Sequence, residues 1–173
     1  MTPRFQSPAT AVVLTISDRC AAGGQVDRSG PAVMRMLADH GLTEVERATL
    51  PDEIGDIAHA LRHYAAEVDL IVTTGGTGLT PRDVTPEATT MVCDRFVDGL
   101  SERMRAEGLK QTPMAVLSRG VCGCIGDTLV INLPGSVAGA EVSLRAIIEL
   151  LPHALDLLAG RGDHGSAGSG AEE

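Results

Sequence analysis

The sequence contains few aromatic residues and few basic ones. Only two of its 173 residues are Phe, one is Tyr and none is Trp, and 14 Lys and Arg stand against 23 Asp and Glu, for a formal net charge of −9. A protein that binds nucleic acid usually carries a basic stripe, and a single-strand binder also carries stacking rings. The composition therefore predicts no nucleic-acid partner.

Long apolar segments and closely paired cysteines are also absent from the sequence. A run of about 18 apolar residues, the minimum for a membrane-spanning helix, does not occur, and residues 1–9 lack the apolar core of a signal peptide. We therefore expect no membrane association and a cytoplasmic location. The four cysteines have neither the C-x-x-C spacing of a zinc site nor the density of a disulfide scaffold, which predicts free thiols. They are Cys20, Cys93, Cys122 and Cys124.

The composition and length fit one well-packed domain. Hydrophobic residues make up 43% of the chain and charged residues 21%, which is ordinary for a globular protein. We expect this domain to span residues 10–160, after a flexible N-terminus over residues 1–9. The last segment, residues 161–173, is glycine, serine and charge with almost nothing to bury, and is predicted to be disordered.

Segments of strand type and of helix type alternate along the chain. Apolar, β-branched runs predict strands at residues 11–16, 43–50, 70–73, 114–117 and 129–133. Helical spacing predicts helices that begin at Ser29 and Thr85 as N-caps, a helix over residues 52–67, and a helix over residues 137–158 that Pro152 kinks or divides. The alternation predicts an α/β fold with a mostly parallel sheet between layers of helices.

Ligands of open α/β sheets bind beyond the carboxyl ends of the strands. This rule selects residues 17–29, 75–85 and 134–136. The second of these lies within "TTGGTGLTPRDVTPEAT", residues 73–89, where three glycines follow a buried strand. Glycines at such a place let successive N–H groups turn toward an anion, although a glycine after a strand is most often only a tight turn.

Side chains of this glycine-rich loop would suit a phosphate. Thr77 can donate a hydroxyl, Arg82 a charged fork, and Asp83 can hold a divalent cation or orient a nucleophile. Asp83 also fits a simple Asx-turn, and Asp52, at the start of a predicted helix, fits an N-cap. The spacing matches neither of the common nucleotide fingerprints, G-x-G-x-x-G and G-x-x-x-x-G-K-[ST].

Five motifs in order resemble one family. "TISDRCAAGGQVDRSGP", "LPDE", the glycine-rich segment, "LSRG" and "NLPGS" are similar to those of the MogA/MoaB family of molybdenum cofactor biosynthesis proteins, which includes the gephyrin-type G domains. The resemblance implies a three-layer α/β/α sandwich with one antiparallel edge strand and a homotrimer. It also implies a molybdopterin adenylyltransferase, which uses Mg²⁺ with ATP to adenylylate molybdopterin and releases pyrophosphate.

The resemblance also assigns roles to individual residues. Asp52 and Asp83 match the acidic pair associated with catalysis and with the Mg²⁺ of ATP. The remaining matched positions are expected to bind nucleotide or pterin: Ser17, Asp18, Asp27, Gly30, Thr74, Gly75, Gly76, Thr77, Gly78, Arg82, Ser118, Pro134, Gly135 and Ser136. Three alternatives remain open: a MoaB-like trimeric or hexameric protein that binds pterin with weak or no transferase activity, a scaffold that assembles without catalysis, and, outside the family, a generic nucleotide-binding α/β protein that binds ATP with no preference for a pterin phosphate.

Overall fold

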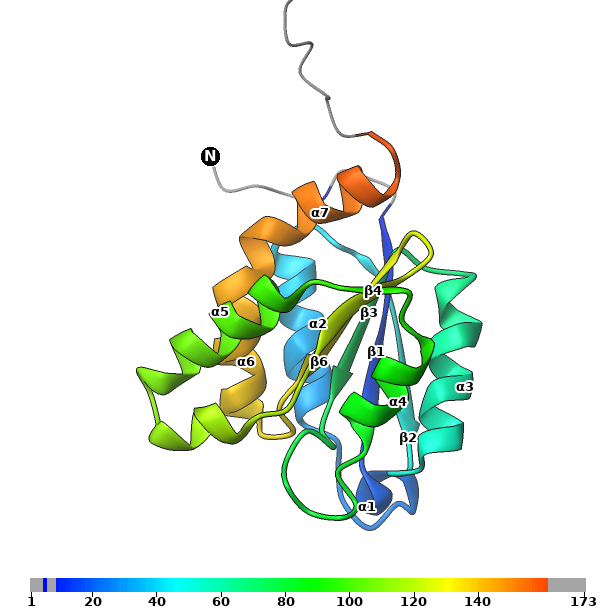
Figure 1. The fold of residues 1–173 in the computed structure, drawn as a ribbon. Coiled ribbons are helices and arrows are strands. Elements are labelled where there is room, and N and C mark those ends of the chain that lie inside the picture. Colours follow the sequence, from blue (N-terminus) through cyan, green and yellow to red (C-terminus); the bar gives the residue numbers. More distant parts are fainter. Residues whose placement is uncertain (1–4, 6–8, 162–173) are drawn as a thin grey trace, which may run out of the picture.

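Six strands form one mixed sheet in the order β2-β1-β3-β6-β5-β4 (Figure 1). The structure is a computed structural model that describes residue 5 and residues 9–161. Strands β2, β1, β3 and β6 are parallel, and β5 pairs antiparallel with both β6 and β4. This confirms the mostly parallel sheet with antiparallel pairing at one edge. The strands are Thr10–Ile16 (β1), Glu44–Leu50 (β2), Leu70–Thr74 (β3), Arg95–Phe96 (β4), Cys122–Ile125 (β5) and Thr128–Leu133 (β6).

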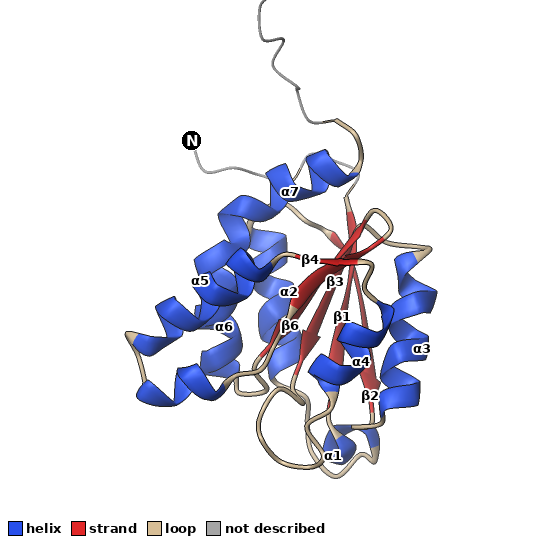
Figure 2. Ribbon diagram, in the orientation of Figure 1, coloured by secondary structure: helices blue, strands red, loops and turns tan. Residues whose placement is uncertain are grey.

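Helices cover both faces of the sheet and give the expected three layers (Figure 2). One face is covered by α3 and α4, and the other by α2, α5, α6 and α7. The helices are Asp18–Ala21 (α1), Ser29–Asp39 (α2), Ile54–Ala65 (α3), Thr85–Val92 (α4), Asp98–Leu109 (α5), Val137–Ile147 (α6) and Leu151–Leu158 (α7), with 3₁₀ turns at Pro113–Leu117 (η1) and Ile148–Leu150 (η2).

The position of β1 between two layers of helices explains why its sequence is apolar without interruption. Val13 packs into the core on the face of α2 and α6, whereas Val12 and Leu14 pack into the core on the face of α3, and none of the three is exposed. Successive side chains of a strand point to opposite faces, so a strand between two helical layers buries every residue. The continuous run therefore correctly predicted a central strand.

The strand predicted at residues 114–117 is wrong. These residues form most of η1, where Met114 is 63% and Val116 58% exposed. Thr112 caps this turn by accepting a hydrogen bond from the Met114 N–H, and Pro113 occupies its first position. A four-residue apolar run does not distinguish a strand from a helical turn, and here the preceding threonine and proline decided the conformation.

Strands β4 and β5 and helix α5 were not predicted. Strand β5, "CGCI", has no β-branched residue except its last, and β4 has two residues. Helix α5, "DGLSERMRAEGL", buries only Leu100, Ser101 and Met104. Its apolar periodicity is therefore too weak to indicate an amphipathic helix from sequence.

Two predicted caps are wrong, and the predicted division of the last helix at Pro152 is confirmed. Ser29 and Thr85 are the first residues of α2 and α4, and neither side chain caps its helix. Ser136 does cap α6, since its hydroxyl accepts a hydrogen bond of 3.1 Å from the Gly139 N–H. Pro152 divides the last helical segment because α7 begins with it in its first turn.

Both chain ends fall mainly outside the described residues. The predictions of a flexible segment over residues 1–9 and a disordered tail over residues 161–173 therefore stay predictions. Phe5, which is described, is 8% exposed and packs against the core. No helix among the described residues is long and apolar enough to cross a membrane.

Candidate active site

The carboxyl ends of β1, β3 and β6 lie next to one another at one edge of the sheet. Thr15 of β1 is paired with Thr74 of β3, and Thr74 with Leu133 of β6. The Gly75 N–H then donates to the Leu133 carbonyl at 3.1 Å, which continues the parallel pairing into the loop. The three loops that follow these strands, residues 17–29, 75–85 and 134–136, meet here as the sequence predicted.

The glycine loop has a backbone that other residues would not readily adopt. Gly75 and Gly76 have φ angles of +92° and +65°, in the left-handed region that favours glycine. A Cβ atom at Gly75 would also clash with the Ile16 carbonyl, and one at Gly135 would lie 3.1 Å from the Gly75 Cα. Thr85 donates its hydroxyl to the Gly75 carbonyl at 2.9 Å. The two glycines thus serve a specific conformation that α4 holds in place.

Two cavities adjoin at this loop. The smaller, of about 390 Å³, is lined by residues from the loops after β1, β3 and β6, and the larger, of about 710 Å³, extends between the glycine loop, α5, η1 and α6. They share four lining residues, which are Gly76, Asp83, Gly135 and Ser136. The arrangement suits two reactants whose reacting groups meet at a common wall.

Asp52 and Asp18 bind one another's backbone. The Asp18 N–H donates to Asp52 Oδ2 at 2.9 Å, and the Asp52 N–H donates to Asp18 Oδ1 at 3.0 Å. Burial raises the pKa of Asp52, and the charges of Asp18 and Asp83 raise it further. The hydrogen bond from the Asp52 backbone lowers the pKa of Asp18, with a further contribution from Arg82. Asp52 is therefore not the N-cap of α3, and ionising it in this acidic surrounding is costly.

Asp83 uses one carboxylate oxygen within its own loop. Its Oδ2 accepts hydrogen bonds from the Thr80 N–H at 2.9 Å and from the Thr80 hydroxyl at 2.7 Å. The predicted Asx-turn is therefore wrong, because the donors lie three residues before Asp83, whereas the Thr85 N–H, two residues after it, donates to the Gly76 carbonyl at 3.0 Å. The Oδ1 atoms of Asp83 and Asp52 accept no hydrogen bond from the described residues, and both aspartates line the smaller cavity.

Arg82 lies outside both cavities and is neutralised by carboxylates. Its guanidinium donates two hydrogen bonds of 3.0 Å to Asp18 and one of 2.9 Å to Glu53. It therefore joins the loop before α4 to the loops around α1 and α3. Since its fork is already occupied, a role in binding phosphate stays a prediction.

Asp27 connects the loop before α2 to the sheet. Its Oδ2 accepts hydrogen bonds from the Thr15 hydroxyl at 2.7 Å and from Arg47 at 3.2 Å, and its Oδ1 accepts one from the Gly30 N–H at 3.0 Å. A Cβ atom at Gly30 would lie 2.6 Å from the Thr15 hydroxyl and would clash with Asp27 Oδ2. Asp27 thus caps α2, the role that was predicted for Ser29, whose hydroxyl instead lies 2.9 Å from that of Thr74.

The predicted site residues divide between the cavities. The smaller cavity alone is lined by Ser17, Asp27, Asp52, Thr74 and Gly75, and the larger alone by Thr77, Gly78, Ser118 and Pro134. Asp18, Gly30 and Arg82 line neither and support the loops around them. Sequence reasoning missed the far wall of the larger cavity, for which only Asn132, a polar residue inside an apolar strand, gave a signal. That wall includes Met104, Arg105, Gln111, Thr112, Asn132 and Ser143.

The described residues hold no group of three or more His, Cys, Asp or Glu side chains that could bind a metal. Asp27, Asp52 and Asp83 line the smaller cavity, and of these only Asp52 and Asp83 have a carboxylate oxygen that accepts no hydrogen bond from the described residues. Mg²⁺ is commonly bound by one or two carboxylates together with substrate phosphates and water. The acidic pair therefore fits a metal ion that arrives with a phosphorylated ligand.

The cysteines are free thiols, as predicted, and three of them, Cys93, Cys122 and Cys124, line neither cavity. Burial raises the pKa of Cys93 to about 12 and that of Cys122 to about 11, and it also raises that of Cys124. These thiols are therefore protonated and unreactive at neutral pH. Cys20 is the one cysteine among the lining residues of the smaller cavity.

A glycine loop at the carboxyl ends of parallel strands, next to two carboxylates, is typical of α/β proteins that bind phosphorylated small molecules. Comparison with known proteins narrows this class. The family model described as "probable molybdopterin binding domain" matches residues 12–153. The chain belongs to this family, and the MogA/MoaB resemblance is confirmed.

Three relatives illustrate the similarity. The chain is 40% identical over 152 residues to a molybdopterin adenylyltransferase of Helicobacter pylori strain J99, covering 86% of each chain. It is 47% identical to the structure of the molybdopterin biosynthesis enzyme MoaB from Thermus thermophilus, with a TM-score of 0.80, covering 88% of this chain and 97% of that one. It is 43% identical over 149 residues to the molybdenum cofactor synthesis protein cinnamon of Drosophila melanogaster, covering 84% of this chain and only 25% of that protein.

Proposed function

We propose that this protein is a molybdopterin adenylyltransferase that transfers AMP from ATP to the phosphate of molybdopterin and releases pyrophosphate. The observation that carries the proposal is the pair of cavities that adjoin at the glycine loop and at Asp83. One cavity would hold the nucleotide and the other the pterin, with both phosphates at the shared wall. The relatives named as molybdopterin adenylyltransferases support the same reaction.

Both reactants are anions, and the described residues line each cavity with a single arginine, Arg28 in the smaller and Arg105 in the larger. Arg82 is paired with Asp18 and Glu53, and Arg119 with Glu87, so neither guanidinium is available without breaking an ion pair. The pKa of Asp52 is raised mainly by burial, and the charges of Asp18 and Asp83 raise it further. A divalent cation would add positive charge next to these carboxylates, and we propose that Mg²⁺ enters with ATP and is held by Asp52 and Asp83.

The chain's own residues would bind and align the reactants. N–H groups of the glycine loop, Gly76 to Gly78, would face phosphate oxygens, and Ser17 and Ser136 lie at the cavity walls. The bound Mg²⁺ would neutralise phosphate charge as it develops. The pterin phosphate attacks the α-phosphorus of ATP directly, so an oxygen–phosphorus bond forms as the bond to pyrophosphate breaks. Positioning and electrostatic stabilisation are the main contributions, and no covalent enzyme intermediate is required.

The proposal is tested by the rate of pyrophosphate release from ATP and Mg²⁺ as molybdopterin is added. We expect release to depend on molybdopterin and to saturate with it. In the absence of molybdopterin we expect no exchange of labelled pyrophosphate into ATP, because no adenylyl-enzyme forms. Pyrophosphate release that is independent of molybdopterin would contradict the proposal.

A second candidate is a MoaB-like protein that binds pterin with weak or no transfer activity. The 47% identity to the Thermus MoaB structure favours keeping it. The presence of both Asp52 and Asp83 beside the glycine loop favours the active enzyme. Tight binding of molybdopterin without any consumption of ATP would select the second candidate.

We also propose that the protein assembles as a homotrimer, as the family resemblance implies. An exposed apolar cluster supports self-association, since large exposed patches commonly mark interfaces. We call this the η1 cluster, and it consists of Leu79, Leu109, Met114, Val116 and Leu117, each between 46% and 65% exposed. Leu79, Met114 and Leu117 also line the larger cavity, so the cluster borders the site. The cytoplasmic location stays a prediction from sequence.

A further inference from the structure

Arg119 lies beside the site without lining it. The segment that carries it connects η1 to β5, and its neighbours Ser118 and Gly120 both line the larger cavity. Arg119 is absent from the lining of either cavity, and its side chain is 34% exposed. A direct contact between this guanidinium and a reactant is therefore not expected.

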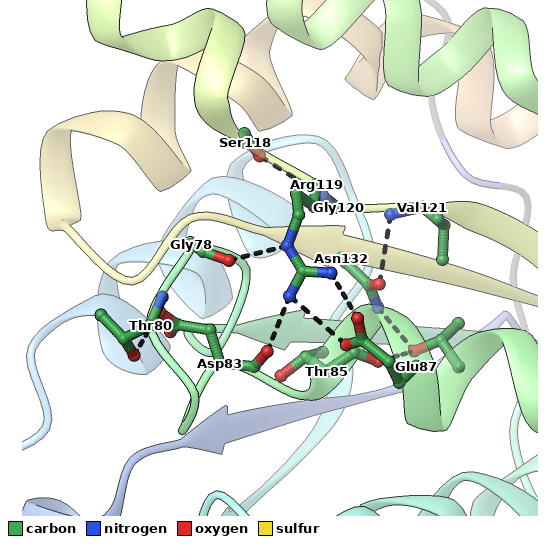
Figure 3. A network of polar contacts seen from close by, with 11 residues as sticks. Gly78, Thr80, Asp83, Thr85, Glu87, Ser118, Arg119, Gly120, Val121 and Asn132 are labelled. Carbon is green, nitrogen blue, oxygen red and sulfur yellow. Dashed lines mark hydrogen bonds and ion pairs between the residues drawn. The ribbon is translucent and has the colours of Figure 1, made fainter.

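The donors of Arg119 converge on one loop (Figure 3). Its Nε donates to the Gly78 carbonyl at 2.8 Å, and its Nη2 donates to the Asp83 carbonyl at 2.7 Å. Its backbone N–H donates to the Thr77 carbonyl at 2.9 Å. One residue thus holds both ends of the loop from Gly78 to Asp83, which we call the 78–83 loop.

Glu87 of α4 fixes the orientation of this guanidinium. Its carboxylate pairs with Arg119 Nη1 and accepts a second, longer hydrogen bond of 3.4 Å from Nη2. The hydrogen bond from Arg119 lowers the pKa of Glu87, so the pair is charged at neutral pH. The Arg119 fork is therefore held between α4 on one side and two backbone carbonyls on the other.

The 78–83 loop is closed internally by Asp83 itself. Asp83 Oδ2 accepts hydrogen bonds from the backbone and the hydroxyl of Thr80. A Cβ atom at Gly78 would lie 2.9 Å from this same oxygen, so the carboxylate rests directly against the glycine loop. Because the ends of the loop are fixed by Arg119, the direction of the Asp83 carboxylate depends on a residue that touches neither cavity.

We propose that Arg119 is a positioning residue, which sets the Asp83 carboxylate for the reaction by holding the carbonyls of Gly78 and Asp83. This inference rests on the proposed function for its effect on turnover. Arginine is required because its planar fork donates in several fixed directions, whereas a lysine ammonium is a single mobile point charge. Arg119→Lys would keep the charge beside Glu87 and lose the simultaneous hold on both carbonyls.

The test compares Arg119→Lys with Arg103→Lys in the full chain. Arg103 is a matched control because its Nε also donates to a backbone carbonyl, that of Ala146 at 2.6 Å, and it lines neither cavity. We expect Arg119→Lys to lower kcat by about 10- to 100-fold, as misplacement of a reacting group does, with KM for ATP and molybdopterin within about twofold of wild type. Arg103→Lys should leave both constants unchanged. Added guanidinium should partly restore kcat in Arg119→Ala.

A second readout does not depend on turnover. Hydrogen exchange measured by mass spectrometry should accelerate at the amides of the 78–83 loop in Arg119→Lys, and should not change in α6. Unchanged exchange in the loop, or a wild-type kcat, would overturn the positioning role. A raised KM with unchanged kcat would overturn it as well, because that result indicates a contact with substrate. Accelerated exchange in a protein whose wild type transfers no AMP would refute the proposed function and leave the positioning of the loop supported.

If Arg119→Lys fails to fold, Glu87→Gln serves as a second variant that perturbs the same interaction. This substitution keeps an acceptor oxygen for Arg119 and removes only the charge. We expect a smaller loss of kcat with the same pattern of loop exchange. If both variants unfold, the residue serves global stability and the proposal is overturned.

Discussion

At the residue scale, Asp83 carries the clearest consequence for activity. Asp83→Asn is expected to lower turnover by at least about 100-fold, since it removes a charged oxygen from a preorganised site. The asparagine oxygen can still accept the hydrogen bonds from Thr80, so fold and oligomeric state should persist. Pyrophosphate release and circular dichroism on the same sample measure both effects.

Asp94→Asn is the matched control for this substitution. Asp94 accepts a hydrogen bond of 2.6 Å from the Gly126 N–H in a turn, as Asp83 does from Thr80, but lies outside both cavities. Its turnover should equal that of wild type. Wild-type turnover by Asp83→Asn, or equal losses in the two variants, would contradict the catalytic role.

The ionised carboxylate of Asp52 should reduce the folding stability of the protein, although the residue is needed for activity. Its pKa is raised in the folded state, mainly by burial, so its contribution to stability is fully present below the unfolded pKa and is lost as pH rises through the folded pKa. Asp52→Asn removes this loss. We expect the melting temperature of the variant, relative to wild type, to increase between pH 4 and pH 7 while turnover is lost.

Thermal unfolding followed by circular dichroism at a series of pH values measures this difference. The amide oxygen of Asn can still accept the hydrogen bond from the Asp18 N–H, so no buried donor is left without a partner. A melting temperature at pH 7 well below that of wild type would mean that Asp52 is mainly a structural residue.

The sequence predicted these residues unevenly, for a physical reason. Asp52, Asp83 and the glycines lie in contiguous motifs directly after or between predicted strands, so their position along the chain indicated their place in space. The far wall of the larger cavity comes largely from α5, which packs beside α6 through contacts distant in the chain, and from η1, which packs beside α5. The roles of Arg82 and Arg119 depend on carboxylates 29 or more residues away in the chain, which no local pattern indicates.

At the element scale, the start of α2 depends on the absence of a side chain at Gly30. Gly30→Ala should destabilise the protein by about 1–3 kcal/mol, because the added Cβ clashes with the Asp27 carboxylate and the Thr15 hydroxyl. Its midpoint of urea unfolding should fall. Activity should fall too, because Asp27 lines the smaller cavity.

Gly55→Ala in α3 is the matched control, because there the added Cβ atom has room. A Cβ at Gly55 meets no atom within 4 Å, and alanine is favoured over glycine in a helix by about 0.5–1 kcal/mol. Its unfolding midpoint should therefore rise. The account of α2 fails if Gly30→Ala is as stable as wild type.

The elements that the sequence predicted best are those whose apolar pattern follows from packing against the core on one or both faces of the sheet. Strands β1, β3 and β6 are buried on both faces, and α3 has one clearly apolar face. Strand β5 contains two cysteines and a glycine, and α5 buries little, so their existence depends on neighbours that are distant in the chain. The antiparallel edge was implied by family resemblance and not by periodicity.

At the scale of the whole molecule, the proposed trimer should depend on the η1 cluster. Val116 is 58% exposed and lines neither cavity, so Val116→Asp should weaken assembly without altering the site directly. Sedimentation velocity should show a shift from trimer toward monomer. Leu157→Asp on α7, where Leu157 is 52% exposed, is the control and should remain trimeric. A wild-type monomer, or an unaffected Val116→Asp trimer, would contradict this assembly.

The central claim is that ATP and molybdopterin meet at the wall shared by the two cavities, where AMP is transferred from ATP to molybdopterin. The measurement that tests it most directly is the mass of the pterin product, compared with the amount of pyrophosphate formed, after incubation with molybdopterin, ATP and Mg²⁺. We predict a molybdopterin carrying one added AMP, in equal molar amount to pyrophosphate. Molybdopterin of unchanged mass, bound to a protein that leaves ATP intact, would contradict the transferase.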